Sequence, residues 1–138
     1  MTPAQLSDEC EGMTGEQVAD LAANALFSIG CHTVDHPYLP RCEPAEMCRQ
    51  ISENKSWLEA VSGVRCDAIA YPLGDYDAAV LELCRKHMFS RGYALSSLLR
   101  STPEFEIPRV GIYSTSLEFL GLKAQWGNLL RAARLAVG

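Results

Sequence analysis

The sequence predicts an α/β domain in which helical crossovers connect the strands of a parallel sheet. Short apolar runs of strand length alternate with longer segments whose apolar residues repeat at helical spacing. Pro and Gly residues lie between these segments, where turns are expected. Such alternation is typical of parallel sheets, because parallel neighbours need a crossover connection. We therefore expect a single domain over residues 1–138, with residues 1–12 as an N-terminal segment of undetermined structure.

The N-terminal half is expected to hold a helix, a strand and a loop. Thr14 and Gln17 have the spacing of a capping box, and an apolar face follows them, which predicts a helix over about 15–26. The short apolar run 27–31 predicts a buried strand. Two prolines within 32–41 predict a loop.

Turn and cap residues also divide the rest of the chain. Pro44 suits the first turn of a second helix, and Gly63 suits the position just after its end. The run 67–71 predicts a strand, and Asp77 can cap a third helix that reaches about residue 87. Two further strands and a last helix are expected at 92–96, at 107–113 and from Ser116 onward.

Composition excludes several classes of function. The chain is 48% hydrophobic and 21% charged, which is typical of a globular protein. Its net charge of −5 and its scattered basic residues predict no nucleic-acid partner. No apolar run reaches transmembrane length and no signal peptide is evident, so we expect no membrane partner and, for the chain as written, a cytoplasmic location. The six cysteines form no CxxC pair and are expected to be reduced and mostly buried.

Two histidines are the first candidates for chemistry. His32 and His36 follow the predicted strand 27–31, and binding sites of such sheets gather beyond the carboxyl ends of the strands. This spacing on a loop can place two imidazoles on one cation, although a zinc site needs a third protein ligand. The spacing alone is equally compatible with two partly exposed loop histidines. Asp35 could hydrogen-bond one imidazole from outside the metal site, or simply be exposed to solvent.

The surroundings of these histidines resemble the polysaccharide deacetylase family, also called the NodB homology domain or carbohydrate esterase family 4. The segment SIGCHTVDHPYL is similar to the histidine motif of that family. The order and spacing of further motifs agree with the family from residue 13 to about 125. The similar segments are SIGCHTVDHPYL at 28–39, ENKSWLE at 53–59 in the helix that leads into Gly63, AIAYPLGDYD at 68–77, RGYA at 91–94 and PRVGIY at 108–113.

The resemblance implies a distorted (β/α) barrel that removes acetyl groups from N-acetylated sugar polymers or oligomers. It implies that His32 and His36 ligate a divalent metal, usually zinc, which activates a water and polarises the acetamide carbonyl. It also implies that the backbone N–H of Leu73, just after the proline of the turn, donates to the oxyanion.

The chain differs from the family at the positions of the catalytic acid and base and of the arginine that orients the base. The paired catalytic aspartates of the family lie on a first strand upstream of the histidine motif, and Asp8 and Glu9 do not lie on such an apolar strand. The late catalytic histidine has no match, and His87 is interpreted as a solvated residue at a helix end. Ala70 stands where many members have an arginine that orients the base. Arg109 is a candidate replacement, although an ordinary surface arginine is the simpler interpretation.

We therefore expect an incomplete barrel of the deacetylase type, with little or no activity in this chain alone. The alternative is a non-catalytic remnant of the fold that binds metal or carbohydrate, or that associates with a second copy through an exposed sheet edge. Structural roles are expected for other residues that could suggest chemistry. These are Cys31 as a buried small residue, Asp75 and Asp77 in a turn and a cap, and Trp57 and Trp126 in the core.

Overall fold

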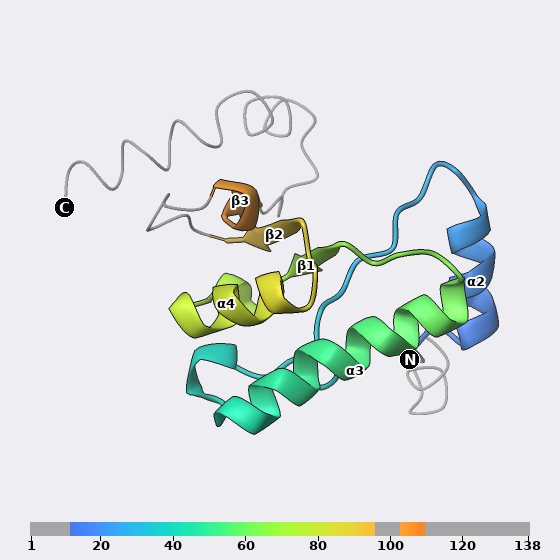
Figure 1. Ribbon diagram of the computed structural model, residues 1–138. Coiled ribbons are helices and arrows are strands. Elements are labelled where there is room, and N and C mark those ends of the chain that lie inside the picture. The colour runs from blue at the N-terminus through green and yellow to red at the C-terminus, as the bar shows by residue number, and fades with distance from the viewer. Residues whose placement is uncertain (1–11, 96–102, 110–138) are drawn as a thin grey trace, which may run out of the picture.

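The computed structural model describes residues 12–95 and 103–109 of the chain. In this part, three parallel strands form one sheet in the order β1-β2-β3 (Figure 1). β1 (Ala68–Ala70) pairs with β2 (Arg91–Ala94), and β2 pairs with β3 (Ile107–Pro108). The α/β class and the parallel sheet are thus as the sequence predicts. No helix among the described residues is both long enough and apolar enough to cross a membrane.

Three α-helices accompany the sheet, and their ends are set by the residues that predicted them. α2 (Gly15–Ala23) begins with the capping box of Thr14 and Gln17. α3 (Pro44–Ser62) begins with its proline and ends at Gly63, whose φ of 68° is the left-handed conformation that glycine adopts without strain. α4 (Ala78–Lys86) is capped by Asp77, whose side chain accepts the Val80 N–H at 2.9 Å.

Short 3₁₀ turns mark the loops between these elements. η1 (Leu39–Arg41) lies in the loop 32–41, which we call the histidine loop. η2 (Pro72–Gly74) follows β1, and η3 (Pro103–Phe105) precedes β3. α3 leads into β1, and α4 leads from β1 to β2, so helices provide the crossovers that parallel strands need. In Figure 1, α3 and α4 lie on the same side of the sheet, and α2 lies at the far end of α3.

The core lies between the sheet and these helices. Its apolar side chains come from every described α-helix and strand except β3. They are Val18, Cys31, Leu39, Met47, Ile51, Leu58, Cys66, Ile69, Tyr71, Val80, Leu81, Cys84, Phe89, Ala94 and Phe105.

The structure corrects the prediction of a buried strand at 27–31. Only Cys31 pairs with β1: its N–H donates to Ala68 O and its C=O accepts the Ala70 N–H, both at 2.8 Å. The residues before it are largely exposed, with Phe27 52% exposed. An apolar run is buried as a strand only if other elements cover it, and the described residues leave Phe27 uncovered. The first helix also ends earlier than expected, because the Asn24 side chain accepts the Leu26 N–H at 3.0 Å and starts a turn.

The remaining elements differ less from expectation. β1 and β2 are shorter than the predicted runs 67–71 and 92–96, and residue 96 lies outside the described residues. β3 begins at Ile107 as expected, but residues 110–113 and the last helix also lie outside them.

Trp57, expected in the core, is 49% exposed on α3, which is a second correction. Trp126 lies outside the described residues.

Candidate metal and deacetylation site

The candidate residues gather beyond the carboxyl ends of successive sheet segments. His32 follows the bridge at Cys31, Leu73 follows β1, and Arg109 follows β3. Parallel strands end at one edge of the sheet, so residues far apart in the sequence reach the same region. The residues for which the sequence predicts metal binding, oxyanion binding or an orienting role therefore lie at this edge.

The two histidines lie side by side. Their ring centroids are 4.8 Å apart and the rings meet edge to face at 76°. His36 has a φ of 54°, and the buried Thr33 between them has a φ of 69°. Such left-handed conformations are uncommon for residues other than glycine, so the loop bends sharply twice to bring the imidazoles together.

A backbone carbonyl fixes the tautomer of His32. The Nδ1 atom of His32 lies 2.7 Å from Ala70 O. A carbonyl oxygen only accepts hydrogen bonds, so Nδ1 carries the proton and, in the neutral ring, Nε2 keeps a lone pair. This is the arrangement in which metal-binding histidines are usually held, with the second ring nitrogen donating to a carbonyl or carboxylate.

Polar side chains of α3 accept hydrogen bonds from the backbone of the histidine loop. The buried Gln50 accepts the N–H groups of Val34 and Asp35 through Oε1, at 3.0 and 2.9 Å. Asn54, one turn further on, accepts the His32 N–H at 3.1 Å. Sequence reasoning gave neither residue a role. The signal was present, since Gln50 and Asn54 lie at helical spacing from the apolar residues Met47 and Leu58 of the same helix.

Asp35 is engaged by α3 and not by a histidine. Its Oδ2 atom accepts hydrogen bonds from Arg49 Nη2 at 2.8 Å and from Gln50 Nε2 at 2.7 Å. These two bonds hold the pKa of Asp35 below its usual value. Glu46 accepts from the same two side chains. Among the described residues, Asp35 therefore orients the loop through α3, and the suggested contact with an imidazole is not formed.

The turn after β1 presents the backbone of Leu73. Leu73 has a φ of 57°, and Gly74, whose N–H donates to Tyr71 O at 2.9 Å, has a φ of 74°. A second bond runs from Asp75 N–H to Pro72 O at 3.2 Å. Neither of the two bonds that close the turn uses the Leu73 N–H. A residue with a Cβ would not fit at Gly74, because that atom would lie 2.5 Å from Leu95 N.

Arg109 reaches across the sheet toward this turn. Its N–H donates to Ala94 O at 2.7 Å, and its Nη2 donates to Tyr71 O at 3.1 Å. His32 and Arg109 thus bind the carbonyl groups of two consecutive residues, Ala70 and Tyr71, at the end of β1.

The third metal ligand is missing from the described residues. Within 12–95 and 103–109, no group of three His, Cys, Asp or Glu side chains is placed to hold one metal ion. Asp8 and Glu9 lie outside these ranges. Asp77 serves as a helix cap, as expected.

The described cysteines and His87 do not join His32 and His36 in a group that could hold a metal ion. Cys31 and Cys84 are buried, and burial raises the pKa of each thiol to about 12. The five described cysteines are free thiols, and Cys10 lies outside the described residues. His87 caps the end of α4 as expected, but it is partly buried against Cys48 and not simply solvated.

Comparison with known proteins agrees with the resemblance of the motifs. The sequence profile of the family described as Polysaccharide deacetylase matches residues 6–91 of the 138. The chain belongs to the polysaccharide deacetylase family. The family expectation drawn from the histidine motif is therefore confirmed. A search of curated proteins found no match.

Solved structures with the same fold include three from bacteria. The deacetylase PplD of Streptococcus pyogenes, solved with acetate, is similar at a TM-score of 0.69 and 20% identity, over 80% of this chain and 49% of that one. IcaB of Ammonifex degensii is similar at 0.66 and 21%, over 82% and 52%. A polysaccharide deacetylase of Bacillus cereus is similar at 0.66 and 23%, over 79% and 35%.

These similarities confirm the fold class as an incomplete α/β deacetylase fold. At such identities they show the fold and not the activity. The chain spans about half, or less, of the length of the structures it matches.

Proposed function

We propose that this chain is part of a metal-dependent deacetylase of N-acetylated polysaccharides or oligosaccharides, with His32 and His36 as ligands of a divalent cation, most simply zinc. The observation that carries this proposal is the histidine pair itself. The two rings are in contact, and the hydrogen bond to Ala70 O leaves Nε2 of His32 available as a ligand. Imidazole nitrogen is a common zinc ligand.

The donor set fits two of the three protein ligands that a catalytic zinc has. When bound, such a metal polarises the substrate carbonyl and lowers the pKa of a bound water. The described residues supply the pair and no third ligand. A carboxylate from a segment outside these residues would complete the donor set.

The backbone of the turn after β1 is suited to the developing oxyanion. The Leu73 N–H is not used by the hydrogen bonds that close the turn, and Arg109, just after β3, binds the carbonyl of Tyr71, the residue before the turn. A donor held rigidly stabilises developing charge without reorganising during the reaction. We assign Leu73 the role of oxyanion donor and Arg109 a positioning role.

Metal binding is tested with the three histidines of the chain. Titration calorimetry with zinc should show one site that His32→Ala and His36→Ala each weaken strongly. His87→Gln is the matched control, because it changes the third histidine of the chain and lies outside the pair. Equal weakening by all three changes would contradict the assignment.

Activity is expected to be low in this chain alone. Proton transfer by a well-placed acid or base contributes about 10²–10⁴-fold to the rate. Among the described residues, no carboxylate joins the two histidines around one metal ion, and the nearby Asp35 is held by Arg49 and Gln50. Acetate release from N-acetylglucosamine oligomers, with added zinc or cobalt, should stay at the level of the His32→Ala variant. Robust turnover that disappears in that variant would show that the chain has its own third ligand and base.

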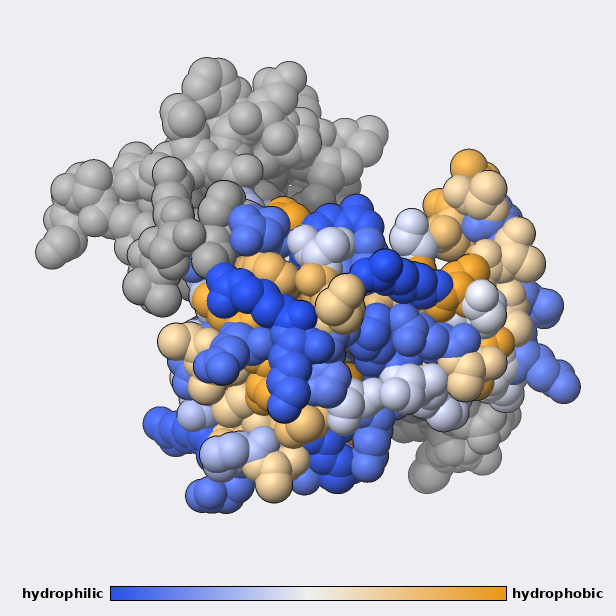
Figure 2. Space-filling model, viewed as in Figure 1, coloured by the Kyte–Doolittle hydropathy of each residue, from blue (hydrophilic) through white to orange (hydrophobic). Residues whose placement is uncertain are grey.

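A second candidate is a remnant of the fold that associates with another copy of the chain. The exposed segment before Cys31 favours it. Leu26 is 90% exposed and Phe27 is 52% exposed, beside a strand edge at Cys31 with which no described strand pairs on its outer side. Figure 2 shows apolar surface gathered on the segment that leaves α2, which projects from the rest of the described chain.

A further inference from the structure

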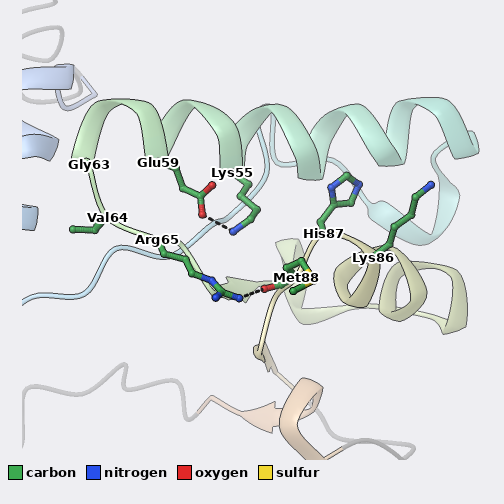
Figure 3. Close-up of a pocket in the computed structure, with 8 residues that line it drawn as sticks. All are labelled: Lys55, Glu59, Gly63, Val64, Arg65, Lys86, His87 and Met88. Carbon is green, nitrogen blue, oxygen red and sulfur yellow. Dashed lines mark hydrogen bonds and ion pairs between the residues drawn. The ribbon is translucent and has the colours of Figure 1, made fainter.

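A cleft near the amino ends of the strands, at the opposite end of the sheet from the histidines, contains a second cluster of reactive groups. It has a volume of about 680 Å³ and is lined from α3, from the end of α4 and from the segments that precede β1 and β2. These segments approach the amino ends of the strands, so the cleft is separate from the candidate metal site. Figure 3 shows Lys55 and Glu59 of α3 facing Arg65 and Met88, with the His87 ring directed toward α3.

The cleft is basic. Lys55, Arg65 and Lys86 line it with one acidic residue, Glu59, which is paired with Lys55 at 2.6 Å. Lys86 and Arg65 are exposed, so their charges face solvent at the mouth of the cleft. An anion that enters meets an excess of positive charge, which raises its local concentration.

A thiol contacts the imidazole of His87, one of the residues that line this cleft. Cys48 Sγ is 3.6 Å from His87 Nε2, and both side chains are partly buried. Cys48 lies seven residues before Lys55 on α3, so the two share one face of the helix. A thiol in contact with an imidazole nitrogen can pass its proton to that nitrogen, which generates the nucleophilic thiolate.

Other described cysteines lack this setting. Cys31, Cys66 and Cys84 are fully buried. Cys42 is partly exposed like Cys48, but its thiol donates to Tyr38 O and lies near Glu46. Burial and that carboxylate raise the pKa of Cys42. Cys42 is therefore a matched internal control in a negative environment.

We propose that Cys48 is a modification site of this chain, at which the thiol, with His87 as its base, forms a mixed disulfide with anionic low-molecular-weight disulfides drawn into the basic cleft. The Cys48 proton passes to His87 Nε2, and the thiolate attacks one sulfur of the incoming disulfide. A new S–S bond forms to Cys48, the old S–S bond breaks, and the departing thiolate takes the electron pair and then the proton. The low-molecular-weight disulfide is the oxidant, so the exchange balances.

The state of His87 suits this role. Burial, together with the neighbouring charges of Lys86 and Lys55, lowers the pKa of the imidazole below its usual value. At neutral pH the ring is therefore neutral and has a nitrogen lone pair for the thiol proton.

The test uses the full chain and three disulfides that differ in charge. These are dianionic 5,5′-dithiobis(2-nitrobenzoate), neutral hydroxyethyl disulfide and dicationic cystamine, with modified peptides quantified by mass spectrometry. With the dianionic reagent, Cys48 should react on the order of tenfold faster than Cys42 at low salt. The advantage should shrink with cystamine and at high salt, because salt screens the cleft.

Two variants separate the proposal from simple accessibility. Lys86→Glu should lower the preference of Cys48 for the dianionic reagent on the order of tenfold. Arg85→Glu, which makes the same charge change on a side chain that lies over the Phe105 ring, should have a much smaller effect. His87→Gln should slow Cys48 with all three reagents and leave Cys42 unchanged.

The proposal is overturned if Cys48 reacts no faster than Cys42, or if Lys86→Glu and Arg85→Glu change the charge preference equally. An unchanged Cys48 rate in His87→Gln would overturn the assigned base. Should His87→Gln fail to fold, the exposed Lys86→Glu variant still decides the matter, because its side chain is not part of the core.

Discussion

Two candidate site residues, His32 and Arg109, each donate a hydrogen bond to a main-chain carbonyl at the end of β1. His32 donates to Ala70 O at 2.7 Å, and Arg109 donates to Tyr71 O at 3.1 Å. Main-chain carbonyls of a sheet are held by the ladder, so they orient side chains more firmly than mobile side-chain partners would. The site is therefore positioned by the sheet itself and not by the histidine loop alone.

Gln50 is the residue on which the conformation of the histidine loop depends most. It is 1% exposed, and its amide binds Val34 N–H, Asp35 N–H, Asp35 Oδ2 and Glu46 Oε1. Gln50→Leu keeps the size and removes all four bonds. We expect it to lower the free energy of unfolding by about 1–3 kcal/mol, since the partly buried hydrogen bonds from the Val34 and Asp35 N–H groups are lost.

Urea unfolding of Gln50→Leu checks this expectation. Ser56→Leu places the same side chain at an exposed position of the same helix and should change stability by less than about 0.5 kcal/mol. NMR of the His32 and His36 ring protons in Gln50→Leu should show a loosened pair. Equal stability of the two variants would contradict the role given to Gln50.

The acidic residues around Arg49 make stability depend on pH. Hydrogen bonds from Arg49 and Gln50 lower the pKa of Glu46 from 4.5 to about 2, and similar bonds lower that of Asp35. In the unfolded chain both carboxyls take up protons at higher pH than in the folded chain. The stabilisation they give is present above about pH 5 and is lost as the pH falls toward 2.

Thermal unfolding between pH 6 and pH 2.5 measures this dependence. In Glu46→Gln the loss of stability on acidification should be smaller than in the unchanged chain. In Glu82→Gln, an exposed change on α4, the loss should match the unchanged chain. The effect should weaken in high salt, because these side chains are partly exposed. A pH profile that Glu46→Gln leaves unaltered would exclude this cluster as its cause.

At the scale of elements, the sequence predicted what local residues determine. The capping box at Thr14, the left-handed glycine at Gly63 and the cap at Asp77 act within a few residues of themselves, and all three are present. The histidine motif, too, is local, and its two rings lie together. These features need no knowledge of distant partners.

The features that the sequence did not predict depend on distant partners. The run 27–31 is apolar enough for a buried strand, yet only Cys31 pairs with β1 and Phe27 remains half exposed. Gln50 and Asn54 acquire their roles only because the histidine loop returns over α3. Periodicity shows that a polar residue lies on an apolar face of a helix, but not which backbone it will bind.

Gly92 allows β2 to pack closely against Tyr71 and Phe105. A Cβ at Gly92 would collide with the Tyr71 hydroxyl and lie 2.7 Å from Phe105 O. These two groups hydrogen-bond to each other at 3.0 Å in the core. Gly92→Ala should therefore lower the free energy of unfolding by about 2–4 kcal/mol, from overpacking and a broken buried bond.

Chemical denaturation compares Gly92→Ala with Gly15→Ala. At Gly15, in the first turn of α2, an added Cβ meets only Val61 at ordinary contact distance. Alanine is also a better helix former than glycine, so Gly15→Ala should be neutral or stabilising. Similar stabilities of the two variants would mean that β2 can move away from Tyr71 at little cost.

At the scale of the whole molecule, the described sheet has an edge at Cys31 that no described strand covers. The Cys31 N–H and C=O are directed at β1, and Asn54 caps the His32 N–H on the other side. The segment before Cys31 carries Leu26 and Phe27 in solvent. Open strand edges with apolar side chains tend to pair with other strands.

Self-association through this edge is the last prediction. Two copies that pair their 26–31 segments about a twofold axis would cover the exposed apolar side chains and form an isologous interface. Sedimentation velocity should show a concentration-dependent species of twice the chain mass. Phe27→Lys should shift the chain to monomer, because a buried, unpaired charge at the interface is costly. Trp57→Lys, which changes an equally exposed aromatic residue on α3, should leave the dimer intact. A chain that is monomeric at all concentrations, or a dimer that both variants weaken alike, would rule out pairing through this edge.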